Sequence, residues 1–492
     1  MAAHGVGRRV WPALLALVAL AAPACGGGDD DGGEPEQAPE RAAIAEPEFG
    51  SIGLSELGRC DPLPVKKGFR CGSIEVPFER EDPSYGTTEI GFAVWPRAER
   101  KQPSEGAIFA VEGGPGYAST GTAAIYHQLF RPLLRNRELV VVDQRGQGTS
   151  ERYDCPHLQA GAGPDFITLS ECARKLGKRF ISYRTSAAAD DIDSVREALG
   201  YERIALYGDS YGTFLAQSYA YRHGDRLEAL VLDSAYPAFG EDPWYPSLPR
   251  TGIRALGKSC DRSPRCDGDA IARLEQAVEF LREERRAPAD LVSALIDAAY
   301  SPPGSYLRLD RALQDLMAGD PDAYIQLTRP ARAGILNNFR YQTAGEYVVG
   351  CNDYPMIWDK YASEPERRAQ LEQAIRSYPQ DAFEPFTTRE VAYAVGAAYH
   401  ECLTFPAPTE VYEPPVDPET QEPTGAPVLV LSGELDDVTT PWEGRTVADL
   451  FPDSEFYLVR NAGHVAALYE PGGPAGTEIR EFLARALNVN PD

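Results

Sequence analysis

The chain has 492 residues, 43% of them hydrophobic, and a formal net charge of −26 at pH 7. This length is too great for one small domain and suits a core domain that carries a large insertion. The strong negative charge excludes nucleic acid as an expected partner, and it argues against electrostatic binding to anionic membranes. It is compatible with a secreted protein whose partners carry positive charge.

Residues 1–25 have the pattern of a lipoprotein-type signal peptide. Arg8 and Arg9 precede an apolar stretch that is too short to span a bilayer. Small residues then lead to Cys25, which we expect to be lipidated, with plain secretion as the alternative. Residues 26–50 are rich in Gly, Asp, Glu and Pro, and we expect a flexible linker because they cannot bury enough apolar surface to become ordered. Membrane contact is therefore expected only through a lipid anchor.

Residues 51–235 are expected to form the first part of an α/β core. Two strands, Ser73 to Phe78 and Thr87 to Trp95, read as an antiparallel hairpin. All-apolar strands then alternate with helical patterns, which indicates a mainly parallel sheet covered on both faces. These elements are a strand at 108–111, a strand at 138–142, a helix at 187–199 with Ser186 as its N-cap, a strand at 203–207, a helix at 213–223 and a strand at 229–232.

The segment Gly208-Asp209-Ser210-Tyr211-Gly212 joins an expected strand to an expected helix. A G-x-S-x-G sequence in this position is typical of a nucleophile elbow, a strained turn that exposes the serine hydroxyl above the sheet. A serine hydroxyl needs a base to take its proton, and the base needs a third group to fix its tautomer. We therefore expect Ser210 to be a nucleophile and look downstream for its partners.

Both partners follow in the order Ser, Asp, His that is typical of this fold. His464 comes after an expected strand at 455–459, and it is the one histidine among six with such a placement. The acid comes from Asp436 or Asp437, after an apolar run at 427–431. We favour Asp436 because it is nearer to the end of that strand.

A glycine-rich turn, Glu112-Gly113-Gly114-Pro115-Gly116, follows the strand that ends at 111. Such a turn can offer a backbone N–H to a developing oxyanion, and the residue after the nucleophile offers a second. We expect the two donors to be the backbone N–H groups of Gly114 and Tyr211.

Together these segments resemble the proline iminopeptidase and tripeptidyl aminopeptidase family of α/β-hydrolases. Further matching pieces are Asp143-Gln144-Arg145-Gly146, Gly433-Glu434-Leu435-Asp436 and Gly463-His464. The resemblance implies an α/β-hydrolase fold, a serine aminopeptidase that acts through an acyl-enzyme, and no cofactor. It also agrees with Asp436 as the acid. One departure is Glu112, since many relatives carry His at this position.

Between residues 236 and 425 no strand is evident, and helical patterns occur at 270–284, 290–299, 307–317 and 365–377. We expect a helical cap here, inserted before the strand that bears the acid, with residues 426–492 returning to the core. An aminopeptidase must hold the substrate ammonium with a carboxylate. The candidates are Glu112, Asp353 and Glu401, and the alternative is that each is an ordinary solvated or backbone-bonded carboxylate.

The cysteines also favour export. Nine are present, and setting Cys25 aside leaves an even number. Disulfides persist in oxidising compartments, although sequence alone does not fix their pairing. We expect neighbouring cysteines to pair, as Cys60 with Cys71, Cys155 with Cys172, Cys260 with Cys266 and Cys351 with Cys402. A metal site is not expected, because there is no Cys-x-x-Cys motif and His is not clustered with Cys.

The function expected from the sequence is an exported serine aminopeptidase that releases an N-terminal residue or a tripeptide from peptides with a free N-terminus. One alternative is an esterase or other small-molecule hydrolase with the same triad. Another is a catalytically silent surface lipoprotein.

Overall fold

The computed structural model describes residues 48–60, 65–160, 166–328, 339–394, 400–409 and 411–489. The expected signal peptide, Cys25 and most of the linker at 26–50 lie outside these residues. None of the described helices combines the length and the apolar character needed to cross a membrane.

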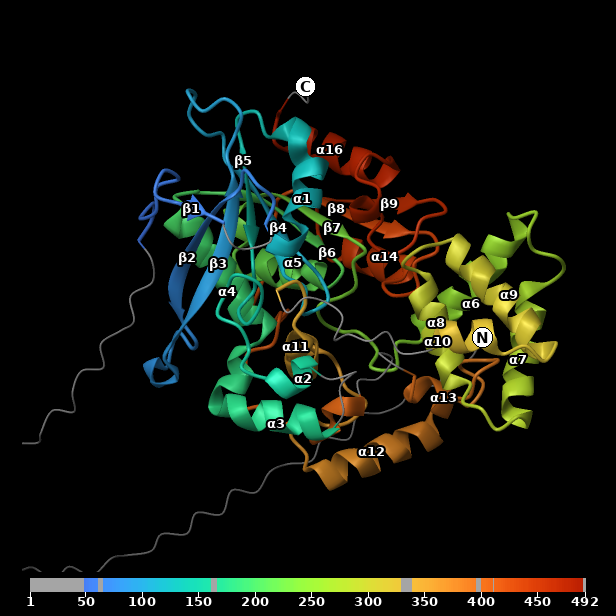
Figure 1. Ribbon diagram of the computed structural model, residues 1–492. Helices are drawn as coiled ribbons and strands as arrows, with labels where there is room; N and C mark the ends of the chain where they lie inside the picture. Colours follow the sequence, from blue (N-terminus) through green and yellow to red (C-terminus); the bar gives the residue numbers. More distant parts are fainter. Residues whose placement is uncertain are drawn as a thin grey trace, which may run out of the picture. The chain divides into compact units, whose positions relative to one another are not determined.

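The described strands form one nine-stranded sheet (Figure 1). The bounds are β1 Gly58–Arg59, β2 Arg70–Pro77, β3 Thr87–Trp95, β4 Ala107–Val111, β5 Glu138–Val142, β6 Ile204–Asp209, β7 Leu227–Asp233, β8 Val428–Gly433 and β9 Ser454–Val459. The spatial order is β1-β2-β3-β5-β4-β6-β7-β8-β9. The pairs from β1 to β5 along this order are antiparallel and the pairs from β5 to β9 are parallel. The predicted strands are all present, and only the short β1 was not expected.

Helices cover both faces of the parallel strands. Side chains alternate along β4, since Ile108 and Ala110 pack into one apolar cluster and Phe109 and Val111 into the other. Because both faces are covered, every residue of β4 is buried, which explains its uninterrupted apolar sequence. One cluster includes residues of α1 (Ser119–Phe130) and α16 (Pro474–Ala486), and the other includes residues of α4 (Thr185–Ala198), α5 (Tyr211–Arg222) and α14 (Pro441–Asp449).

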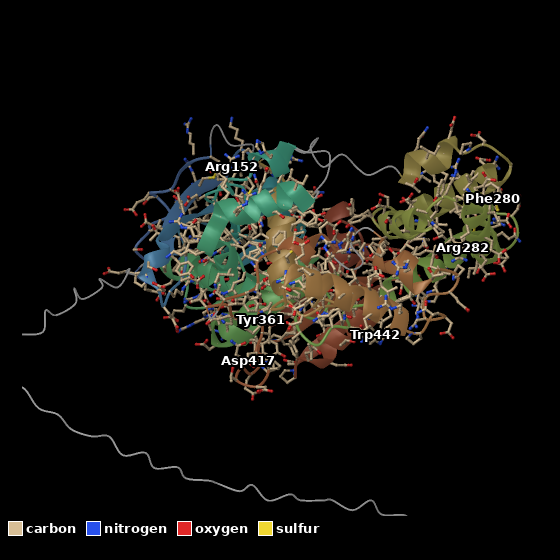
Figure 2. All side chains as sticks on the ribbon, turned by 90° about the horizontal axis from the view of Figure 1, so that it is seen from below. Arg152, Phe280, Arg282, Tyr361, Asp417 and Trp442 are labelled. Atoms are coloured by element: carbon tan, nitrogen blue, oxygen red, sulfur yellow. A yellow bond between two sulfur atoms is a disulfide. The ribbon has the colours of Figure 1, made fainter. Side chains whose placement is uncertain are left out.

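The described residues between β7 and β8 contribute helices and no strand of the sheet, at the position where we expected a cap. These helices are α6 Ser247–Asp261, α7 Ala270–Glu283, α8 Ala289–Ala298, α9 Gly304–Met317, α10 Asp322–Thr328, α11 Thr343–Asp353, α12 Glu364–Ser377, α13 Thr388–Ala392 and the 3₁₀ turn η6 His400–Thr404. Leu274, Leu291 and Leu313 lie in their shared apolar core. An ion pair of 2.7 Å from Arg282 (labelled in Figure 2) to Glu390 links α7 to α13.

Smaller elements complete the core. They are η1 Pro83–Tyr85, η2 Arg131–Leu133, α2 Pro156–Ala160, α3 Phe166–Leu176, η3 Gly177–Ser182, η4 Gly224–Arg226 and α15 Ala466–Tyr469.

One expected helix start is wrong. Helix α4 begins at Thr185 rather than after an N-cap at Ser186. The backbone N–H and the hydroxyl of Thr185 both donate to Asp353 Oδ2 at 2.6 Å. A carboxylate 168 residues away therefore satisfies the first turn, so a local serine cap is not needed. The Ser186 hydroxyl instead donates to the carbonyl of Glu413 at 3.1 Å.

The eight cysteines of the described residues form four disulfides between sequence neighbours. The pairs are Cys60–Cys71, Cys155–Cys172, Cys260–Cys266 and Cys351–Cys402. The last pair joins the end of α11 to η6, two elements that carry acidic residues discussed below.

Candidate active site

Ser210 lies at the tip of the turn between β6 and α5. Its backbone has φ +51° and ψ −126°, a conformation that costs free energy for any residue other than glycine. The flanking glycines are required by close packing. A Cβ on Gly208 would lie 2.2 Å from the carbonyl of Gly212, and one on Gly212 would lie 2.5 Å from the carbonyl of Val111. The turn therefore has the strained, closely packed geometry expected of a nucleophile elbow.

His464 follows β9 and reaches the serine. Its Nε2 lies 2.9 Å from Ser210 Oγ. The loop is fixed on both sides of the histidine, because its backbone N–H donates to the carbonyl of Ala299 at 2.9 Å and the N–H of Val465 donates to Ser234 Oγ at 2.7 Å. The ring is 2% exposed, so the imidazole is held in one orientation.

Asp436 lies on the other side of the imidazole. Its Oδ2 is 3.0 Å and its Oδ1 3.2 Å from His464 Nδ1. The carboxylate also accepts hydrogen bonds of 3.0 Å from the N–H groups of Val438 and Thr439 and from the Thr439 hydroxyl. These donors hold the carboxyl group in place beside the imidazole, where it can keep the proton on Nδ1 and leave Nε2 free to accept a proton.

Asp437 points away from the imidazole into the cap. A Cβ on Gly252 of α6 would lie 2.1 Å from Asp437 Oδ2, so the carboxyl packs directly against that helix. Neither carboxyl oxygen makes a hydrogen bond of normal geometry in the described part of the chain, and the nearby Tyr306 hydroxyl donates to the carbonyl of Leu435 at 3.1 Å. Burial, and then the neighbouring charge of Asp436, raise the pKa of Asp437 well above its usual value.

The glycine turn that contains the expected oxyanion donor Gly114 lies against the serine turn. A Cβ on Gly113 would come within 2.6 Å of Ser210 Cβ and 3.1 Å of the Tyr211 nitrogen, so the glycine turn packs against the start of α5. The Gly113 N–H donates to the Asp209 carboxyl. Within the described residues the N–H groups of Gly114 and Tyr211 have no hydrogen-bond acceptor, which leaves both available to a ligand.

Above Ser210 lies a cavity of about 690 Å³. The charged side chains of its lining are mostly acidic, and tyrosines are its aromatic residues apart from His464. The acidic residues are Glu112, Asp209, Asp297 and Glu346, the basic residue is Arg340, and the tyrosines are Tyr117, Tyr300, Tyr341 and Tyr469.

Two family models match the chain. Residues 106–251, which contain Ser210, match the alpha/beta hydrolase fold, and residues 390–488, which contain Asp436 and His464, match the TAP-like protein family. Tripeptidyl aminopeptidase from Streptomyces lividans is 23% identical over 475 residues, which cover 86% of this chain and 82% of that protein. The chain has the α/β-hydrolase fold, and it is similar to members of the proline iminopeptidase and tripeptidyl aminopeptidase group.

Other comparisons cover less of the hydrolase or are more distant. Serine protease Hip1 from Mycobacterium tuberculosis is 26% identical over 219 residues, 40% of this chain, and the match spans only 42% of Hip1. Proline iminopeptidase from Neisseria gonorrhoeae is 27% identical over 34% of the chain and 41% of that protein. Among solved structures, proline iminopeptidase from Mycobacterium smegmatis gives a TM-score of 0.40 at 17% identity, covering 85% of this chain and 99% of that one.

Glu112 belongs to a buried acid pair near Ser210. The Tyr126 hydroxyl lies 3.0 Å from Glu112 Oε2 and 2.7 Å from Asp209 Oδ2, so one phenol proton is placed between two carboxyl groups. Burial raises the pKa of both acids, and the charge of Glu112 raises that of Asp209 further. Glu112 lines the cavity, so of the three candidates for the ammonium it is the one placed there.

Asp353 and Glu401 are not among the residues that line this cavity. Asp353 is occupied at the start of α4 and accepts a further hydrogen bond of 3.3 Å from Tyr412, so its role in the structure is to hold that helix. Glu401 lies in η6, 3.5 Å from His400. It acts on the cavity indirectly, because its charge raises the pKa of Glu346.

Glu346 is one of the cavity acids that the sequence analysis did not single out, together with Asp209 and Asp297. It lies in α11, it accepts a hydrogen bond from the Tyr341 hydroxyl, and burial together with the charge of Glu401 raises its pKa to about 7. The available signal was a single acidic residue in an otherwise small and apolar stretch, Thr343-Ala344-Gly345-Glu346-Tyr347-Val348-Val349. Such an isolated charge in a buried helix needs a partner or a ligand.

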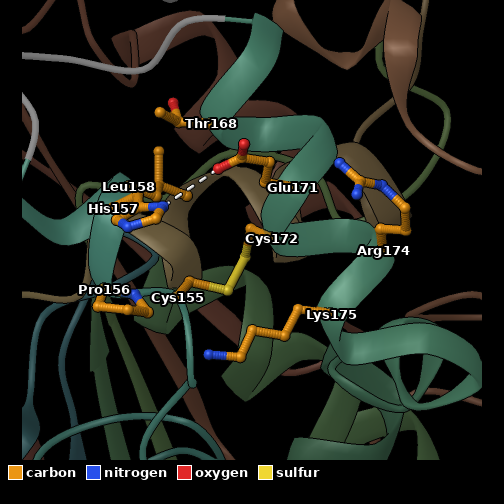
Figure 3. A pocket seen from close by; sticks show the side chains of 9 residues that line it. All are labelled: Cys155, Pro156, His157, Leu158, Thr168, Glu171, Cys172, Arg174 and Lys175. Carbon is orange, nitrogen blue, oxygen red and sulfur yellow. Dashed lines mark hydrogen bonds and ion pairs between the residues drawn. A yellow bond between two sulfur atoms is a disulfide. The ribbon is translucent and has the colours of Figure 1, made fainter.

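A separate cavity of about 360 Å³ lies between α2 and α3 (Figure 3). The Cys155–Cys172 disulfide lies in its wall, and His157 Nδ1 is 3.2 Å from Glu171 Oε2. None of the residues that line it belongs to the Ser210 site, and its ion pair is largely exposed, so we assign it no part in the chemistry.

Proposed function

We propose that the hydrolase is an exported serine aminopeptidase. It releases an N-terminal residue or a tripeptide from peptides that carry a free N-terminus. The observation that carries this proposal is the hydrogen-bonded series Ser210–His464–Asp436 at a cavity lined by carboxyl groups. The likeness to tripeptidyl aminopeptidase over most of both chains supports the same reading.

In the first half-reaction, Ser210 Oγ attacks the carbonyl carbon of the scissile peptide bond while His464 Nε2 takes the hydroxyl proton. The carbonyl oxygen becomes an oxyanion and accepts hydrogen bonds from the N–H groups of Gly114 and Tyr211. The position of Tyr211 at the start of α5 adds the positive end of the helix dipole. The C–N bond then breaks, His464 returns the proton to the leaving amine, and an ester on Ser210 remains.

In the second half-reaction, a water molecule takes the place of the leaving peptide. His464 removes a proton from the water, the hydroxide attacks the ester carbonyl, and the same two N–H groups stabilise the second oxyanion. The C–O bond breaks, and the proton on His464 passes to Ser210 Oγ. The products are the released acid, the shortened peptide and the regenerated enzyme.

The carboxyl groups of the cavity supply the reason for an N-terminal preference. A substrate ammonium that enters beside Ser210 meets Glu112 and Glu346, both drawn out of bulk water. A charge-assisted hydrogen bond is stronger in such a site than at the surface. The bound ammonium favours the ionised form of these carboxyl groups. Substrate binding therefore lowers their pKa and offsets the increase that burial causes.

The proposal of export rests on the disulfides. Four of them occur in the described residues, and such bonds persist in oxidising compartments. Lipidation at Cys25 is part of the same proposal, but it concerns a residue outside the described part of the chain. Mass spectrometry of the protein recovered from the producing cell tests both the cleavage site and the modification.

The decisive assay compares peptide anilides with free and acetylated N-termini. We expect hydrolysis of the free-amine anilides and at least about a hundredfold lower kcat/KM for the acetylated ones, because the latter lack the charge that the carboxyl groups bind. Equal rates on both, with rapid hydrolysis of simple esters, would favour the esterase. No hydrolysis and no labelling of the folded protein by a fluorophosphonate would favour the silent binding protein.

A further inference from the structure

A second cavity adjoins the catalytic one at His464. It measures about 440 Å³ and shares three lining residues with the catalytic cavity, namely Tyr300, His464 and Tyr469. The rest of its wall comes mainly from residues 459–463, before His464, and from residues 473–475 at the start of α16. The Tyr300 ring stands edge-on to the imidazole, with 5.2 Å between the ring centres.

The position of the second cavity beside His464 matters for the departure of the leaving amine. The proton for the leaving amine comes from His464 Nε2, so the atoms just beyond the scissile bond must pass beside the imidazole. The catalytic cavity holds the carboxyl groups that suit the N-terminal, acyl side of the substrate. The part of the peptide that leaves therefore needs a different route away from Ser210, and the second cavity begins at the residue that protonates it.

The second cavity contains a basic side chain that is free to bind a ligand. Arg460 is exposed, and within the described residues its guanidinium makes no hydrogen bond or ion pair. A basic side chain without an acidic partner is unexpected in a chain with 74 acidic and 48 basic side chains. The nearby carboxylate of Glu434 is already held by Arg262 at 2.8 Å, by Lys258 at 3.2 Å and by the N–H of Asn461 at 3.0 Å.

The wall also contains one acidic residue, Glu470, whose side chain lies against Gly473. A Cβ on Gly473 would be 2.8 Å from Glu470 Cδ. A neighbouring hollow shares Arg460 and Asn461 with this cavity and reaches Arg262, whose charge is balanced by Glu434. The uncompensated cation on this path is therefore Arg460.

We propose that this cavity binds the leaving segment of the peptide substrate and that Arg460 pairs with a carboxylate on that segment. The carboxylate is an acidic side chain or, in a short peptide, the C-terminal carboxylate. This inference rests on the aminopeptidase function proposed above and adds to it a selectivity on the leaving side.

The test uses free-amine peptides that share one acyl part, chosen as that of the best-hydrolysed anilide. Their leaving segments are Ala-Gln-Ala-amide, Ala-Glu-Ala-amide and Ala-Gln-Ala with a free C-terminal carboxylate. The wild type is expected to cleave the two anionic segments with a kcat/KM about two- to fivefold above the neutral one, the range of an exposed ion pair. Comparing the two anionic peptides separates side-chain from C-terminal recognition, and the preference should shrink at high salt.

The variant Arg460→Gln should bring both ratios to about one, and Arg460→Lys should keep part of the preference because it retains the charge. Each ratio compares kcat/KM for an anionic and the neutral peptide in the same variant. A smaller fraction of folded protein lowers both values equally and leaves the ratio unchanged. The control is Arg265→Gln, an exposed arginine that lines neither cavity, and it should keep the wild-type ratios.

Equal cleavage of neutral and anionic segments by the wild type would overturn this inference while leaving the aminopeptidase function intact. So would preservation of the preference in Arg460→Gln. If the wild type hydrolysed no free-amine substrate at all, the proposed function and this inference would fall together.

Discussion

His464 Nε2 lies 2.9 Å from Ser210 Oγ although 254 residues separate the two in the chain. The contact depends on β7 and β8 pairing in parallel, because these strands flank the long helical insertion and bring the second part of the core beside the first. Three residues that are far apart in the sequence therefore lie next to one another at one edge of the sheet. Any change that separates β7 from β8 should abolish activity together with folding.

The choice between the two neighbouring acids can be tested by isosteric substitution. Asp436→Asn should lower kcat by about four orders of magnitude, because an amide cannot hold the imidazole in the required tautomer as the carboxylate does. Asp437→Asn should keep activity within a few-fold, since its carboxyl faces Gly252 rather than His464. Steady-state kinetics on one anilide measures both, and the reverse ranking would move the acid to residue 437.

Asp437→Asn should also stabilise the protein at neutral pH. The pKa of Asp437 is higher in the folded state than its value near 3.8 in the unfolded state. Above pH 3.8 the unfolded carboxyl group is ionised, so folding must either bind a proton or bury the charge. The contribution of Asp437 to the free energy of unfolding is fully present below pH 3.8. It is lost as the pH rises towards the pKa of the folded state. Thermal melts at pH 5 and pH 8 should show a higher Tm for the variant at pH 8, and a lower Tm there would show that the carboxylate has a partner.

Glu346 should affect substrates according to the charge of their N-terminus. Glu346→Gln should lower kcat/KM for free-amine anilides about 10- to 100-fold, mainly through KM, because a partly buried ammonium loses its anionic partner. In the wild type, ionisation of Glu346 with its pKa of about 7 should contribute a rise in kcat/KM through neutral pH, and the variant should lack that contribution.

The control for this measurement is Glu364→Gln, which removes an exposed carboxylate of α12 that pairs with Arg368. It should match the wild type in both rate and pH profile. If Glu346→Gln behaved as the control does, Glu112 would be left as the principal ammonium ligand.

A buried acid at the start of α14 should make stability depend on pH. Glu443 is held by the Ser247 hydroxyl at 2.8 Å, and burial, then the charge of Glu241, raise its pKa to about 8. Its unfolded pKa is near 4.5, so its contribution to stability is lost as the pH rises from there through about 8. Glu443→Gln should therefore show a smaller fall in Tm between pH 5 and pH 8, whereas the exposed Glu455→Gln should follow the wild type.

Much of this site was predictable because its signals are local. The elbow at Ser210, the glycine turn before Pro115 and the placement of His464 after a strand each depend on a few adjacent residues. Close packing explains why the glycines at 208 and 212 are visible in the sequence, since a Cβ at either position would meet a backbone carbonyl. The all-apolar strands were equally evident because helices cover both faces of the sheet.

What the sequence did not reveal depends on distant contacts. Asp353 looked like a ligand for an ammonium, yet it caps α4 from 168 residues away. Glu346 was missed because its environment is created by Tyr341 and by η6, which the Cys351–Cys402 disulfide brings close. That Arg460 and His464 line the same cavity is visible only in the structure.

The most direct test of the central claim is active-site labelling combined with hydrolysis. A fluorophosphonate should modify the folded wild type at Ser210, identified by mass spectrometry of the labelled peptide, and Ser210→Ala should remain unlabelled. The same variant should lose on the order of a million-fold in turnover of free-amine anilides. Labelling at another serine, or a folded Ser210→Ala variant that keeps most of its activity, would contradict the account.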